Sequence, residues 1–179
     1  KKWLVNTLIK TENLILSTMN LKTVRLFMEN NFDTQNILGW QCSPYWPTID
    51  IMTELFSMEK LLCSNPSHDI YGIWMVILRH NGVIIGDVGF RATPDINGTL
   101  AIDYGIVPDQ RNKGYGFEAV STIFSFMLQN PAVSVVKAKC HCENIFSLKI
   151  LYKIGMTVES QTGKIISLSY VKNFIPRAC

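Results

Sequence analysis

Two apolar runs separated by an Asn-Gly pair place the strongest constraint on how this chain can fold. The runs are residues 71–78 and 83–90, and Asn81 and Gly82 lie between them. Asn and Gly tolerate the positive φ that both central residues of a two-residue hairpin turn require, and this turn matches the twist of the flanking strands. The pattern therefore predicts an antiparallel hairpin. A third apolar run at 99–107 follows another turn, so we expect three consecutive strands to form a meander.

The spacing of apolar residues changes to a helical period after Pro108, and this second pattern ends before Pro131. A helix between the strand at 99–107 and the next apolar run at 133–140 predicts that these two strands are parallel, joined by a crossover. The predicted fold class is therefore α+β, with a mixed, mostly antiparallel central sheet flanked by helices. The remaining elements that we expect are strands at 14–16 and 164–171, a helix capped by Asn20, and helices at 51–62 and 144–153.

The composition limits the size and partners of the molecule. The chain has 179 residues, of which 47% are hydrophobic and 17% charged, so it can bury one core and is too short for two ordinary domains. We expect a single domain over residues 1–179, with an apolar surface compatible with a homodimer. The net charge of +3 is scattered along the chain without a basic run, which argues against a nucleic-acid partner.

Other features of the sequence concern its compartment. No apolar stretch reaches the roughly 18 residues needed to span a bilayer, so no membrane is expected. Residues 1–10 lack the uninterrupted apolar run and cleavage site of a signal peptide. The five cysteines are odd in number and widely spread, which makes a disulfide framework improbable. The sequence therefore predicts a cytoplasmic protein.

The segment with the clearest chemical meaning is the loop that joins the third strand to the long helix. Residues 111–116 read Arg-Asn-Lys-Gly-Tyr-Gly, the pattern Arg-x-x-Gly-x-Gly. Two glycines let the backbone approach an anion closely, and the first turn of the helix offers unpaired N–H groups, so diphosphate is the natural ligand. The segment matches neither the dinucleotide fingerprint nor a Walker loop. A glycine-rich turn without a ligand is the alternative interpretation.

The loop and three further motifs together resemble the GNAT superfamily of N-acetyltransferases. The chain has Thr-Glu-Asn-Leu-Ile-Leu-Ser at 11–17, Gly-Asp-Val-Gly at 86–89, and Asn144-x-x-Ser147 followed by Gly-Met at 155–156. These motifs occur in the same order in the ribosomal-protein N-terminal acetyltransferase group, to which the chain is most similar. The resemblance covers about residues 11–171 and implies the GNAT fold.

The resemblance implies an acetyl-CoA-dependent enzyme that transfers the acetyl group directly to a primary amine, either a protein N-terminus or a small molecule. The glycine-rich loop would hold the cofactor's pyrophosphate, and two strand residues and Asn144 would contact its pantetheine arm. Ser17 stands where the group usually has Arg, so a non-catalytic acyl-CoA-binding module remains the alternative. The cofactor-binding residues expected from the resemblance are Ile106, Val107, Arg111, Asn112, Lys113, Gly114, Tyr115, Gly116, Asn144 and Ser147.

The catalytic residues are less well defined by the sequence. A general base on the meander strands could be Asp103 or Asp87, and we select Asp103, although a strand Asp is often only solvent-facing. Many relatives have a general-acid Tyr at the position that Leu151 occupies here. The neighbouring Tyr152 lies about 100° around the helix, so Ser147 is the proton donor that we favour.

Two further clusters complete the candidate residues. Residues 140–142 read Cys-His-Cys, but structural zinc needs four ligands and strand alternation separates the histidine from the cysteines, so no metal is expected. Trp40, Tyr45 and Trp46 lie around two prolines. They could line an acceptor pocket or simply hold a loop in place.

Overall fold

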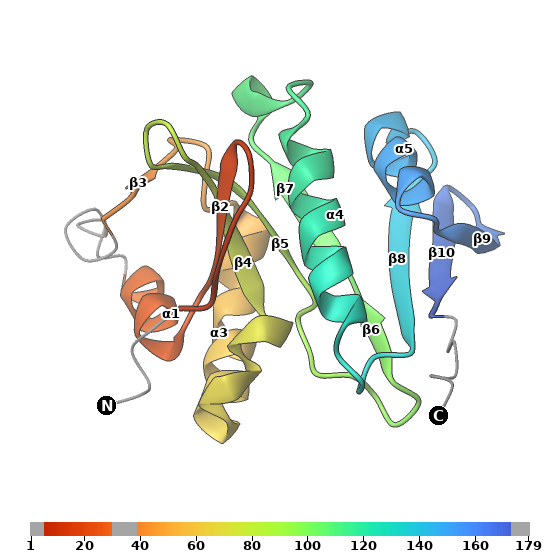
Figure 1. Ribbon diagram of the computed structural model, residues 1–179, viewed down its shortest axis with the longest axis horizontal. Helices are drawn as coiled ribbons and strands as arrows, with labels where there is room; N and C mark the ends of the chain where they lie inside the picture. Colours follow the sequence, from red (N-terminus) through yellow and green to blue (C-terminus); the bar gives the residue numbers. More distant parts are fainter. Residues whose placement is uncertain (1–5, 30–38, 173–179) are drawn as a thin grey trace, which may run out of the picture.

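The computed structural model describes residues 6–29 and 39–172, which form two sheets side by side (Figure 1). Residues 1–5 and Cys179 lie outside the described residues. The expectations about a signal peptide and a disulfide framework partly concern these residues. The first sheet has the order β1-β2-β4-β5-β3, and β7 also pairs with β5; the second has the order β6-β8-β10-β9. The strands of the first sheet are β1 (Leu8–Lys10), β2 (Leu14–Thr18), β3 (Gln41–Cys42), β4 (Ile73–Leu78), β5 (Val83–Gly89) and β7 (Asp103–Ile106). Those of the second are β6 (Thr99–Ala101), β8 (Val135–His141), β9 (Thr157–Thr162) and β10 (Ile165–Val171).

The predicted hairpin is present as β4 and β5, but its turn differs from the expectation. Gly82 has a positive φ of 70°, whereas Asn81 does not belong to the residues with positive φ. The N–H of Gly82 donates to the carbonyl of Leu78 at 2.8 Å, so residues 79–82 form a four-residue loop in place of a two-residue turn. The side chain of Asn81 instead accepts a hydrogen bond from the N–H of Val83 at 3.1 Å.

The third apolar run is divided between the two sheets. Its first part, β6, pairs in parallel with β8, and its second part, β7, pairs antiparallel with β5. Ile102 lies between them, 5% exposed, and its N–H donates to the carbonyl of Lys137 at 2.8 Å. The expected meander is therefore confirmed for β4, β5 and β7, while β6 belongs to the other sheet. Beyond Ile102 the strands β7 and β8 are not paired with each other.

The predicted parallel crossover is confirmed. It runs from β6 through α4 (Tyr115–Leu128) to β8, and α4 buries Val120, Phe124 and Met127. After β8 comes α5 (Ile145–Lys153), whose N-cap is Asn144. The strand β9 was not expected from the sequence, and all six of its residues are exposed.

Helices α1 (Leu21–Met28) and α3 (Ile49–Ser64) cover one face of the first sheet, and α4 lies against its other side (Figure 1). Asn20 caps α1 by accepting a hydrogen bond from the N–H of Thr23, as predicted. The side chain of Glu118 on α4 accepts hydrogen bonds from the Thr11 hydroxyl at 2.6 Å and from the N–H of Asn13 at 2.8 Å, which fastens the β1–β2 turn to the start of α4. None of the helices in residues 6–29 and 39–172 is long and apolar enough to cross a membrane.

Candidate active site

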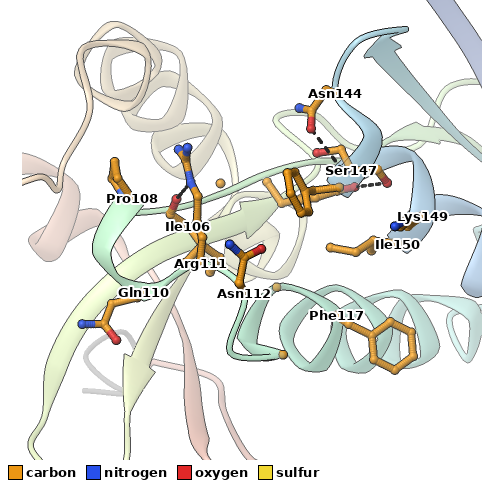
Figure 2. A pocket seen from close by; sticks show the side chains of 15 residues that line it. Ile106, Pro108, Gln110, Arg111, Asn112, Phe117, Asn144, Ser147, Lys149 and Ile150 are labelled. Carbon is orange, nitrogen blue, oxygen red and sulfur yellow. Dashed lines mark hydrogen bonds between the residues drawn. The ribbon is translucent and has the colours of Figure 1, made fainter.

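A cavity of about 600 Å³ lies where β7 and β8 part, between the first turns of α4 and α5 (Figure 2). In Figure 2, Ile106 at the end of β7 and Arg111 in the loop that follows lie across the cavity from Asn144 and Ser147 at the start of α5, and Phe117 comes from α4. A cavity of this size is within the range of small-molecule sites. Its lining residues are Tyr104, Gly105, Ile106, Pro108, Gln110, Arg111, Asn112, Gly114, Gly116, Phe117, Asn144, Phe146, Ser147, Lys149 and Ile150.

The glycine-rich loop forms one end of this cavity. It follows the short helix η3 (Pro108–Gln110) and turns through positive φ at Asn112 (61°) and Gly114 (86°). In the part of the chain that the structure describes, no acceptor is hydrogen-bonded to the N–H groups of residues 112–117. Gly114 is the N-cap of α4 and has no side chain to cap the helix. Consecutive free N–H groups at a helix N-terminus form an anion site, and they fit the pyrophosphate of a coenzyme A molecule.

The other loop residues have separate structural roles. The Nε of Arg111 donates to the carbonyl of Ile106 at 2.8 Å, so the side chain folds back on the end of β7. The Nζ of Lys113 donates to the side chain of Gln110 at 2.9 Å. A Cβ on Gly116 would lie 3.2 Å from the Cδ1 of Ile150, so this glycine allows α4 to begin close to α5. Tyr115 is the first residue of α4 and packs against the core, and it does not line the cavity.

Ile106 and Val107, which we expected to pair with the pantetheine arm, differ in whether their backbone N–H groups are already hydrogen-bonded. The N–H of Val107 donates to the carbonyl of Ile85 at 2.9 Å, and its carbonyl accepts from the N–H of Gln110 at 3.1 Å. Both backbone groups of Val107 are therefore already used within the protein. Backbone groups of successive strand residues point to opposite edges, so the N–H of Ile106 points away from β5. Among the described strands, β7 has no partner on that edge.

Asn144 and Ser147 lie together on the opposite wall. The Oδ1 of Asn144 accepts a hydrogen bond from the N–H of Ser147 at 3.1 Å, which leaves the amide NH₂ for a ligand. The hydroxyl of Tyr104 on β7 donates to the carbonyl of Ser147 at 3.1 Å and so bridges the gap between β7 and α5. Burial raises the pKa of Tyr104 to about 12, although its hydrogen bond to Ser147 acts in the opposite direction. Sequence reasoning did not identify Tyr104.

The sequence of residues 13–157 matches the profile of the family described as the acetyltransferase (GNAT) domain. The chain belongs to the GNAT acetyltransferases. The match spans more than half of the chain and includes the glycine-rich loop and Asn144. The protein is therefore an acetyl-CoA-dependent N-acetyltransferase, and the expected fold class is confirmed.

Individual relatives agree with this assignment. The chain is 26% identical to the uncharacterized N-acetyltransferase YjdG of Bacillus subtilis (strain 168) over 164 residues, which are 92% of this chain and 98% of YjdG. Its fold is similar to that of a ribosomal-protein-S5-alanine acetyltransferase from Vibrio fischeri, with 16% identity, a TM-score of 0.69, and 94% and 98% of the two chains covered. It is also similar to the ribosomal L7/L12 α-N-protein acetyltransferase RimL in complex with coenzyme A, with 14% identity, a TM-score of 0.63, and 92% and 98% covered.

This GNAT domain has a second, smaller cavity of about 240 Å³. Five residues at the end of β7 and in the loop that follows line both cavities, so the two spaces share a wall. The shared residues are Tyr104, Gly105, Ile106, Pro108 and Arg111. The residues that line only the smaller cavity are Tyr45, Trp46, Thr48, Asp50, Ile51, Gly86, Asp87, Arg91, Asp103 and Val107.

Asp87 is a partly buried carboxylate in the smaller cavity. Its Oδ2 accepts a hydrogen bond from the Nε1 of Trp46 at 2.8 Å. No hydrogen bond to its Oδ1 is present among the described residues. Burial is the main cause that raises the pKa of Asp87 to about 6. The negative charges of Asp103 and Asp50 also raise this pKa, whereas the Trp46 hydrogen bond and the positive charge of Arg91 lower it.

Asp103 lines the same cavity but both of its oxygens are engaged. Its Oδ2 forms an ion pair with Arg91, which also contacts Glu54 at 2.9 Å. Its Oδ1 accepts a hydrogen bond from the N–H of Tyr104 at 2.8 Å. The side chain is 54% exposed. Of the two carboxylates that the sequence offered as a base, only Asp87 therefore has an oxygen without a partner among the described residues.

The remaining candidates divide between the cavities and other parts of the molecule. Tyr45 and Trp46 line the smaller cavity, whereas Trp40 does not. Tyr152 is 49% exposed and Leu151 is buried, and neither lines either of these two cavities. In the described ranges, no group of three or more His, Cys, Asp or Glu side chains could hold a metal ion.

Proposed function

We propose that the larger cavity binds acetyl-CoA and that the smaller cavity binds the primary amine that receives the acetyl group. The observation that carries the proposal is the shared wall at the end of β7. A thioester that reaches past Ile106 from the larger cavity would meet an amine that enters the smaller one. Holding the two substrates in contact is a large part of what an acyltransferase must do.

The proposed binding of acetyl-CoA uses the residues expected from the sequence, with one change. The free N–H groups of the loop at 112–117 would hold the pyrophosphate, and Arg111 would supply a positive charge beside it. The N–H of Ile106 and the side-chain amide of Asn144 would hydrogen-bond the pantetheine arm. Val107 would contribute only to the wall of the acceptor cavity.

In the proposed reaction, Asp87 replaces Asp103 as the proton acceptor. The free oxygen of Asp87 would take a proton from the ammonium group of the acceptor, directly or through one water molecule. The neutral amine then attacks the thioester carbonyl, so that a C–N bond forms and the C–S bond breaks. The attacking nitrogen then loses its second proton and the departing thiolate takes one, with the hydroxyl of Ser147 as the proposed relay: it donates its proton to sulfur and recovers one from the nitrogen, directly or through water. Asp103 would instead hold Arg91 in place through its ion pair.

Binding of acetyl-CoA can be tested first without knowledge of the acceptor. A ligand at 100 times its dissociation constant stabilises the fold by about 2.7 kcal/mol, which for a chain of this size is a rise in Tm of about 5–10 °C. The measurement is a thermal shift with acetyl-CoA. An unchanged Tm at millimolar acetyl-CoA would contradict the proposal for the larger cavity.

Gly114→Val is the variant that tests the loop. Gly114 has a φ of 86°, and the space beside its Cα, into which Val would project, is open in the structure. Val would therefore strain the backbone and fill space at the pyrophosphate site. We expect acetyl-CoA affinity to fall at least tenfold. The matched control is Gly163→Val, at a φ of 58° with open space around it in the β9–β10 turn. It introduces the same type of strain far from the cavity, and we expect it to leave acetyl-CoA affinity unchanged.

A further inference from the structure

The smaller cavity contains more negative charge than its own cations neutralise. Three carboxylates line it, from Asp50, Asp87 and Asp103, together with the guanidinium groups of Arg91 and Arg111. Arg91 is already paired with Asp103 and with Glu54, which lies outside the cavity lining. Two carboxylates, those of Asp50 and Asp87, therefore have no ion-pair partner among the described residues.

The two carboxylates occupy different depths of the cavity. Asp87 lies on the central strand β5 and is partly buried, whereas Asp50 lies in the exposed first turn of α3. Burial is the main cause of the raised pKa of Asp87, and the charge of Asp50 contributes to it. The two carboxylates are thus close enough to interact. The ring of Tyr45, 59% exposed, lies on the same lining as Asp50 and offers an aromatic surface to a cation.

The volume of the cavity limits what can enter it. At about 30 Å³ per water molecule in the liquid, 240 Å³ holds about eight water molecules. This is enough for a short aliphatic diamine or for the first one or two residues of a peptide.

We infer that the acceptor carries two positive charges, the primary amine that is acetylated against Asp87 and a second cation that binds Asp50 and Tyr45 at the mouth of the cavity. This inference rests on the proposed function, since it assigns the acceptor class of the same site. A free diamine and a peptide N-terminus followed by a basic residue share this chemistry. A monoamine fills only the inner position and leaves Asp50 without a counterion.

The test compares pairs of acceptors that differ only in the second charge. Butylamine and diaminobutane have the same chain length, and a short peptide with Lys at its second position can be compared with one that has norleucine there. We expect kcat/KM to be about fivefold to tenfold higher for the dicationic member of at least one pair, because the second cation gains both an ion pair with Asp50 and a contact with the ring of Tyr45. Which pair shows the preference identifies the source of the acceptor.

Asp50→Asn is the decisive variant, because Asp50 is exposed and its replacement leaves the core intact. We expect it to reduce the preference for the second charge to less than threefold, measured as the ratio of kcat/KM within each pair so that a change common to both acceptors cancels. The matched control is Glu12→Gln, which removes a carboxylate from an exposed turn that lines neither cavity and should keep the preference. If no acceptor is turned over, calorimetric binding of the same four compounds to the protein loaded with coenzyme A replaces kcat/KM.

The outcomes separate the two proposals. Absence of acetyl-CoA binding contradicts the proposed function itself. Normal acetyl-CoA binding without a preference in either pair overturns only the inference about the acceptor. A preference that Asp50→Asn leaves intact also overturns it, because the second cation would then be recognised elsewhere.

Discussion

Replacement of Asp87 by Asn should stabilise the fold at neutral pH while it removes activity. The pKa of Asp87 is raised from 3.8 to about 6, chiefly by burial. One pKa unit corresponds to about 1.4 kcal/mol, so the ionised carboxylate costs the folded state about 3 kcal/mol. The Nε1 of Trp46 donates to Asp87 at 2.8 Å, and Asn can still accept this hydrogen bond. The raised pKa already includes the stronger hydrogen bond that the ionised carboxylate accepts. Asn lacks the hydroxyl of a protonated carboxyl group, so it recovers only part of this free energy. The expected net gain is therefore about 1–3 kcal/mol.

The size of this effect changes with pH in a defined window. In the folded state Asp87 keeps its proton up to a pH of about 6, whereas in the unfolded chain it loses the proton near 3.8. The wild type therefore loses stability as pH rises from about 4 to about 6, and Asn at this position does not. Between pH 6 and 9 the variant should be more stable by the full amount. Below about pH 3 the difference should disappear, because the carboxyl group is then neutral in both states, and at pH 4 most of the difference should already be lost.

The assay is urea unfolding of both proteins at several pH values, with the free energy of unfolding extrapolated to zero denaturant. For a chain of this length the gain at pH 8 corresponds to an increase in Tm of about 3–10 °C. The reasoning about a desolvated carboxylate is refuted if the variant is less stable than the wild type at pH 8, or if the stability difference does not change between pH 4 and pH 8.

Two further variants test other contacts of the structure. Ser147→Ala should lower kcat about tenfold or more with acetyl-CoA affinity unchanged, because a proton donor to the thiolate acts only in the transition state. Tyr152→Phe should have no effect, since Tyr152 lines neither cavity. Steady-state kinetics with saturating acetyl-CoA distinguish the two variants, and a larger loss of kcat in Tyr152→Phe would reverse the assignment. Glu118→Ala removes the acceptor of hydrogen bonds from Thr11 and Asn13. The free energy of unfolding should therefore fall by about 1–3 kcal/mol, as measured by urea unfolding. Equal stability of variant and wild type would mean that these hydrogen bonds only replace hydrogen bonds to water.

The sequence predicted those helices and strands whose residue pattern is contained in the segment itself. Helix α4 has a regular apolar stripe, and α1 and α5 begin at the asparagines that cap them. The strand β9 was missed because it is an edge strand with every residue exposed, so it has no alternation of buried and exposed positions. The division of one apolar run into β6 and β7 was also not predictable, because it depends on which strand each half meets in the folded protein.

The same distinction holds for the candidate site. The glycine-rich loop is contiguous in sequence, and its backbone geometry follows from residues 111–116 themselves. The hydrogen bond between Trp46 and Asp87 joins residues 41 positions apart, and the bridge from Tyr104 to Ser147 joins residues 43 apart. Neither pair has a local signature. The choice between Asp87 and Asp103 likewise depends on Arg91, whose ion pair with Asp103 exists only in the folded chain.

The division at Ile102 also determines how the active site can change shape. A single run of backbone belongs to both sheets, and at Ile102 it is fixed to Lys137 and buried in the core. We infer that Ile102 is the hinge point between the two sheets. Any widening of the space between β7 and β8 is then a rotation about this residue, with small displacements at β6 and the largest ones at the first turns of α4 and α5.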